Sequence, residues 1–132
     1  MLFRSKIGSA LATAPSSPKP PVDVEPALTD RLTAEVHRLE AIEGMISDWS
    51  LNGDHAAAAA YNVARTTCRR AERGIIALLE SGEGVQPSIL SYVNRLSDLI
   101  WLFSRKLEFD AGINSSLRSQ TGKAGNRWSR AW

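Results

Sequence analysis

The strongest indication of fold in this chain is a set of apolar residues that recur in alternating steps of four and three. They are Ile89, Val93, Leu96, Ile100, Phe103 and Leu107. Such steps keep side chains on one face of an α-helix, whereas a strand needs a period of two. Pro87 suits the first turn of this helix, and Gly112 suits a position beyond its end. The pattern predicts a helix from Pro87 to about Asp110.

Two earlier segments have the same helical period. The first contains the apolar stripe Leu32, Val36, Leu39, Ile42, Ile46 and Trp49. It predicts a helix from Thr29, which would act as the N-cap, to Trp49. The second segment follows a break in the period and predicts a helix over residues 55–81, with Asp54 as the N-cap and Gly82 beyond the end. The sequence therefore predicts an all-α fold, a bundle of about three helices.

The two ends of the chain lack a sustained period. All six prolines except Pro87 lie in residues 1–28, which predicts a disordered N-terminal segment. The first 22 residues contain basic side chains and no acid, a composition also compatible with a transit peptide. Residues 113–132 are basic and form a predicted C-terminal tail, which leaves residues 29–112 as the folded domain. The tail has no recognisable nucleic-acid-binding motif, so we do not expect a nucleic-acid partner.

Composition narrows the class of protein. The chain has 132 residues, a formal charge of +2 and 43% hydrophobic residues, which fits one small globular domain. Its apolar runs are far shorter than the roughly 18 residues of a membrane span. Cys68 is the single cysteine, so no internal disulfide forms, and no metal site is indicated. We expect a cytoplasmic protein that self-associates, because three helices bury only a marginal core.

Arg65, Arg69 and Arg73 recur every four residues, so they share one face of the predicted helix, with Glu72 beside them. Neighbouring guanidinium groups repel one another. One interpretation is a solvated face with local Arg–Glu pairs. The other is a surface that holds a polyanion such as a triphosphate. These residues alone leave both interpretations open.

Two motifs make the sequence similar to the cobalamin (corrinoid) adenosyltransferases of the propanediol-utilisation type. One is Ala-Arg-Thr-Thr-Cys-Arg-Arg-Ala-Glu-Arg at residues 64–73, and the other is Val-Asn-Arg-Leu-Ser-Asp at residues 93–98, where the family begins with Leu. The resemblance covers about residues 29–112. It implies a trimeric helical protein that transfers the 5′-deoxyadenosyl group of ATP to cob(I)alamin, with triphosphate as the leaving group.

The resemblance also implies site residues. The family's ATP contacts correspond to Arg69, Arg70, Glu72, Arg73 and Asn94, with Arg69 as the catalytic candidate. Glu72 could orient an arginine or a water bound to Mg²⁺. Asn94 and Asp98 lie four residues apart and share a helix face, where they could contact ligand or form a hydrogen bond between helices.

Trp49 stands where the family has the phenylalanine of Phe-x-Leu-Pro-Gly-Gly, an aromatic ring associated with the corrinoid. Asn52 and Asp54 replace the proline and the second glycine of that motif. Trp49 is therefore a candidate corrinoid contact, and the alternative is a core or interface aromatic.

The family's N-terminal phosphate loop and the helix with Asp-Glu-Leu-Asn have no match in the sequence. The family counterpart of Arg65 pairs with an acid from that region, so a second polypeptide could complete the site. The alternative is an inactive, N-terminally shortened relative that acts as a nucleotide-sensing or assembly subunit.

Overall fold

The computed structural model describes residues 2–14, 16–46 and 54–113. It contains four helices: α1 (Leu2–Ala12), α2 (Ala27–Glu40), α3 (Ala56–Glu80) and α4 (Pro87–Asp110). No strand occurs in the described ranges. The prediction of an all-helical fold is confirmed, with one helix more than the expected three.

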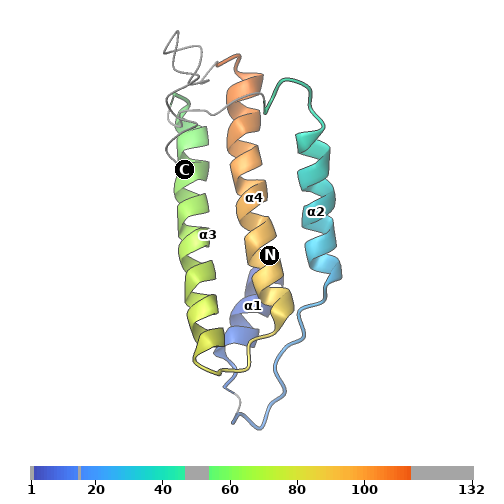
Figure 1. Cartoon of the computed structure of the whole chain (residues 1–132), viewed down its shortest axis with the longest axis vertical. Helices are drawn as coiled ribbons and strands as arrows, with labels where there is room; N and C mark the ends of the chain where they lie inside the picture. The colour runs from blue at the N-terminus through green and yellow to red at the C-terminus, as the bar shows by residue number, and fades with distance from the viewer. Residues whose placement is uncertain (1, 15, 47–53, 114–132) are drawn as a thin grey trace, which may run out of the picture.

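The three longer helices lie side by side in one layer, with α4 between α2 and α3 (Figure 1). A short turn joins α3 to α4, so these two helices are antiparallel, whereas α2 and α4 run in the same direction. The short helix α1 lies behind the first turns of α4 in this view. The central helix α4 therefore positions every other element of the fold.

Two hydrophobic clusters, one at each end of the layer, form the core. One cluster joins α1, the start of α2, α3 and the first half of α4: Ala10, Val24, Leu28, Ile75, Ile89 and Val93. The other joins the end of α2 to the second half of α4: Val36, Leu39, Met45, Leu99 and Leu102. Because α4 contributes to both clusters, its apolar pattern needs to be wider than a single stripe.

The ends of α3 and α4 lie close to where the sequence predicts them. Gly82 and Gly112 both have positive φ, at 84° and 67°. After α3, the amide of Glu83 donates to the carbonyl of Leu78 at 3.2 Å, and after α4 the amide of Ile113 donates to that of Glu108 at 2.9 Å. This is the Schellman arrangement, which places glycine in the left-handed conformation.

The N-terminal ends of α2 and α3 differ from the prediction. Helix α2 begins at Ala27 after Pro26, so Thr29 lies inside it rather than at its N-cap. The N-cap of α3 is His55, whose Nδ1 accepts a hydrogen bond from the amide of Ala58 at 3.3 Å, in place of the expected Asp54. An imidazole nitrogen supplies the acceptor that the free amides of a first turn require.

The C-terminal end of α2 differs more strongly from the prediction than the N-terminal ends do. The helix ends at Glu40 instead of continuing toward Trp49. The chain then turns through Gly44, whose φ of 79° favours glycine. This turn buries Met45 in the core and leaves Ile46 41% exposed, so the apolar stripe continues in space without a continuous helix. Trp49 lies outside the described residues.

The prediction of disorder over residues 1–28 is wrong for α1 and for the segment before α2. Ile7, Ala10 and Leu11 of α1 pack against the first cluster, and Val24 is 1% exposed. The side chain of Gln86 accepts from the amide of Val24 at 2.9 Å. Nζ of Lys6 forms an ion pair with Oε1 of Glu25 at 3.3 Å. These contacts fix the segment although it is rich in proline. The basic tail from residue 114 onward lies outside the described residues.

No helix in the described ranges has the length and apolar character needed to cross a membrane.

Candidate functional site

Helix α3 presents the arginine row on one side of the α3–α4 pair, which we call the arginine side: Arg65, Arg69 and Arg73 of α3 with Asn94 of α4. Arg65 is half-buried, whereas Arg69, Arg70 and Arg73 are exposed. Within the described part of the chain, Arg69 has an ion pair, but Arg65, Arg70 and Arg73 have none. Three guanidinium groups therefore remain available to an anion.

Glu72 connects the two candidate motifs. It lies at the seam between α3 and α4 and is only 6% exposed. Its Oε2 accepts a hydrogen bond from Nη1 of Arg69 at 2.6 Å, and its Oε1 accepts one from Nδ2 of Asn94 at 2.8 Å. A buried carboxylate requires such partners to compensate for lost hydration. The arrangement holds Arg69 and Asn94 beside each other, and each carboxylate oxygen of Glu72 has a partner within the chain.

Asn94 forms the hydrogen bond between helices that the sequence left as one alternative. The residue remains exposed while it does so. Asp98, one turn later, pairs with Arg95 of the same helix at 3.3 Å. The side chains of this pair are 36% and 48% exposed, so the contact adds little to stability.

Cys68 lies beside the arginine row but turns toward α4, where its Sγ contacts the carbonyl oxygen of Val93 at 3.4 Å. Burial raises the pKa of this thiol, and the nearby carboxylate of Glu72 raises the pKa further, against the opposing charge of Arg69. The protonated thiol is a poor metal ligand. Moreover, no three His, Cys, Asp or Glu residues are grouped for a metal ion in the described ranges.

A second polar contact between α3 and α4 was not singled out from the sequence. Nδ2 of Asn62 donates to Oγ of the buried Ser104 at 3.0 Å. One residue along α4, Arg105 forms an ion pair with Glu108, and both side chains are buried. The only available sequence signal was two opposite charges three residues apart within an apolar stripe.

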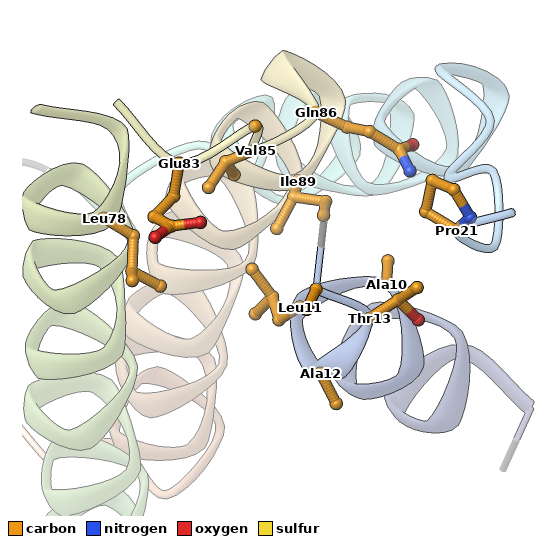
Figure 2. A pocket seen from close by; sticks show the side chains of 12 residues that line it. Ala10, Leu11, Ala12, Thr13, Pro21, Leu78, Glu83, Val85, Gln86 and Ile89 are labelled. Atoms are coloured by element: carbon orange, nitrogen blue, oxygen red, sulfur yellow. The ribbon is translucent and has the colours of Figure 1, made fainter. Parts of the chain in front are cut away.

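The structure has a pocket of about 240 Å³ (Figure 2), and no residue of the arginine row lines it. Leu11 of α1, Leu78 of α3, Ile89 of α4 and the turn at Glu83 line it. Its walls are mostly aliphatic, and Glu83 contributes a negative charge, so it does not suit a phosphate group. The candidate site is therefore the open arginine side of the α3–α4 pair.

A family model described as cobalamin adenosyltransferase matches residues 3–107. The match includes α1, which corrects the expectation that the resemblance begins near residue 29. Among curated proteins, the corrinoid adenosyltransferase of Bacillus subtilis (strain 168) is 36% identical over 84 residues, which are 64% of this chain and 39% of that protein. The corrinoid adenosyltransferase of Mycobacterium tuberculosis (strain H37Rv) is 34% identical over 95 residues, 71% of this chain and 49% of that protein.

Solved structures give the same result. A variant of the PduO-type ATP:corrinoid adenosyltransferase from Lactobacillus reuteri, complexed with cobalamin and ATP, is 26% identical with a TM-score of 0.77, over 86% of this chain and 62% of that chain. Another variant of that protein, complexed with ATP, has a TM-score of 0.73. The chain spans half or less of the length of the curated relatives named above. By the extent of the family match and by its fold, the chain belongs to the cobalamin adenosyltransferase family.

Proposed function

We propose that the chain binds ATP on its arginine side and transfers the 5′-deoxyadenosyl group to cob(I)alamin. The observation that carries the proposal is the Arg69–Glu72–Asn94 contact beside guanidinium groups that lack an ion pair in the described ranges. A buried carboxylate that orients one arginine makes the group a preorganised anion site rather than a flexible charge. The solved relatives complexed with ATP and cobalamin support the choice of ligands.

The proposed reaction is a displacement at the ribose C5′ carbon. Cobalt(I) of the reduced corrinoid supplies an electron pair and forms the cobalt–carbon bond. The bond from C5′ to the triphosphate oxygen breaks, and its electron pair leaves with the triphosphate. Arg69, Arg70 and Arg73 would stabilise this growing negative charge, and Asn94 would donate to or accept from a ribose or phosphate oxygen. Glu72 would act by positioning Arg69 and Asn94.

Mg²⁺ would enter with the nucleotide. The described residues contain no cluster of metal-ligating side chains, so phosphate oxygens and water would be its ligands. Trp49 remains a proposed corrinoid contact that lies outside the described residues. We expect a homotrimer with the nucleotide between subunits, in which an acid from another polypeptide pairs with Arg65. We expect the protein to act in the cytoplasm, where reductants keep the single cysteine free.

The test is conversion of chemically reduced cobalamin to adenosylcobalamin by the purified protein with Mg-ATP, followed by absorbance. We expect turnover in wild type and loss of turnover in Arg69→Ala. An Arg31→Ala variant is the matched control, because Arg31 is an exposed arginine on α2 that has no ion pair in the described ranges. Absence of turnover with every corrinoid offered would refute the transferase assignment.

A second candidate function is a nucleotide-sensing or assembly subunit without catalysis. It is favoured by the ion pair between Arg69 and Glu72, because a carboxylate of the same chain already offsets the charge of the catalytic candidate. This function predicts ATP binding without adenosylcobalamin formation. Turnover by the purified chain alone would exclude it.

A further inference from the structure

The pocket of about 240 Å³ lies where several parts of the fold meet, and the proposed reaction does not use it (Figure 2). Helix α1 and the residues after it form one wall with residues 10–14. The end of α3 contributes Leu78, and the turn after α3 contributes residues 83–86. Ile89 of α4 and Pro21 complete the lining. Segments far apart in the sequence therefore form one concave surface.

The larger side chains of this surface are aliphatic. Leu11 of α1, Leu78 of α3 and Ile89 of α4 point into the same space from three different helices (Figure 2). Apolar walls hold water poorly, and an engineered apolar cavity of about 150 Å³ in another protein stays dry and binds benzene. The pocket therefore has room for an apolar group of at least that size.

Two polar side chains of the lining are already engaged within the chain. Oγ1 of Thr13 donates to the carbonyl of Ser9 at 2.8 Å. The side chain of Gln86 accepts from the amide of Val24 at 2.9 Å and donates to the carbonyl of Val22 at 2.8 Å. These hydrogen bonds hold the walls of the pocket together, so neither side chain is the group that selects a ligand.

Glu83 differs from the rest of the lining. Its side chain points from the turn toward the space between Leu78 and Leu11 (Figure 2). Glu83 is exposed, and it has no ion pair within the described residues. No basic residue is among the described residues that line the pocket. Aliphatic neighbours lower the local dielectric, which strengthens the attraction between this carboxylate and a cation.

We propose that the pocket binds a small organic ammonium ion. Its aliphatic body would lie against Leu11, Leu78 and Ile89, where burial of apolar surface is favourable. Its charged nitrogen would donate hydrogen bonds to the carboxylate of Glu83. An anion of the same size would be repelled, and a neutral alcohol would lack the charge. The arginine row does not line the pocket, so this binding is separate from the proposed function.

The first test compares n-hexylammonium, hexanol and hexanoate, which have carbon chains of equal length and differ in charge. Each is titrated into the full chain near pH 7 without nucleotide, and amide chemical shifts report binding. We expect saturable binding of n-hexylammonium, at least about 3-fold tighter than that of hexanol, with hexanoate the weakest. Absence of saturable n-hexylammonium binding, or hexanoate binding of equal strength, overturns the proposal.

The second test assigns the charge selectivity to one carboxylate. Glu83→Gln should weaken n-hexylammonium binding by at least about 3-fold and leave hexanol binding unchanged. Glu80→Gln is the matched control, because Glu80 is also exposed but does not line the pocket. An equal effect of the two substitutions would mean that the ammonium ion is attracted to surface charge in general, and this result overturns the proposal.

The third test assigns the apolar contact. Leu78 and Leu79 are neighbours on α3 with the same 41% exposure, but only Leu78 lines the pocket. Leu78→Ala should weaken n-hexylammonium and hexanol alike, by at least about 3-fold, whereas Leu79→Ala should weaken neither. Both positions are partly exposed, so both variants should fold, and the amide spectra of the same samples check this. Unchanged affinity in Leu78→Ala overturns the proposal, whether or not the protein binds ATP.

Discussion

The α3–α4 pair has two sides that differ in their contacts. Polar and charged contacts dominate the arginine side, whereas apolar packing dominates the side that faces α1, which we call the α1 side. On the arginine side, a buried carboxylate of Glu72 fixes Arg69 and Asn94, while Arg65 and Arg73 have no ion pair in the described ranges. On the α1 side, aliphatic side chains pack against α1 or form an apolar stripe. Like charges held together on the arginine side lower the stability of the fold, whereas apolar packing on the α1 side raises it. We therefore expect function and folding to be separable by mutation in this fold.

The largest expected effect is on the arginine side. Arg69→Ala should lower the rate of adenosyl transfer by on the order of 100-fold or more, because a charged donor to the leaving phosphates is lost. The Arg69 side chain is 46% exposed, so the unfolding midpoint should change little. The measurement pairs turnover with thermal unfolding, and Arg31→Ala serves as the control. An equal loss of turnover in Arg69→Ala and Arg31→Ala would contradict a specific role for the arginine side.

On the α1 side, Ile89→Ala should show the reverse behaviour. Ile89 is 1% exposed and joins α1 to α4, so its truncation should cost about 2–5 kcal/mol in the free energy of unfolding. Denaturant titration measures this cost. ATP affinity, measured on the fraction that remains folded, should stay within a few-fold of wild type. A selective loss of ATP binding without destabilisation would show that the two sides are not separable.

Glu72 is buried at the seam between α3 and α4 on the arginine side, so its substitution should affect both activity and stability, each to an intermediate extent. Glu72→Ala removes the acceptor of Arg69 and Asn94, so we expect turnover to fall on the order of 10-fold to 100-fold through lost orientation. Stability should fall by about 1 kcal/mol, since solvent can hydrate the exposed donors that remain. Glu72→Gln should recover part of the activity by retaining one acceptor. Full activity in Glu72→Ala would contradict the positioning role.

The smallest expected effect concerns Cys68. Burial and the carboxylate of Glu72 hold the pKa of this thiol above that of an ordinary cysteine, so the reactive thiolate should form only at higher pH. Alkylation of the native protein by iodoacetamide should therefore have a pH–rate midpoint above that of the denatured chain. Glu72→Gln should lower the midpoint, because it removes a neighbouring negative charge. A midpoint at or below the denatured value would place Cys68 in a more polar environment than the structure does.

Much of the fold could be predicted from residue spacing. The stripe from Ile89 to Leu107 and the turn glycines Gly82 and Gly112 located α3 and α4 to within one residue at most ends. Helix α1 was missed because residues 1–28 were treated as one proline-rich segment. All of these prolines follow Ala12 and therefore do not interrupt α1. Helix α2 was extended too far because Met45, buried through a turn at Gly44, continues the apolar contact without helical backbone.

The candidate site was predictable only in part. The spacing of the arginines required that Arg65, Arg69 and Arg73 share a face, and Glu72 three residues after Arg69 made a local ion pair plausible. The contact from Glu72 to Asn94 joins residues 22 apart in sequence, so it depends on how α3 packs against α4. No local pattern determines that rotation. The role of Glu72 as a link between the two motifs therefore required the structure.

Calorimetric titration of the purified chain with Mg-ATP, with and without reduced cobalamin, tests most directly whether the arginine side holds a nucleotide. Wild type and Arg31→Ala should bind ATP equally, and Arg69→Ala should bind at least about 10-fold more weakly, as expected when a charge-assisted contact worth more than about 1.4 kcal/mol is lost. Binding of equal strength in Arg69→Ala, or no binding by wild type, would contradict the account.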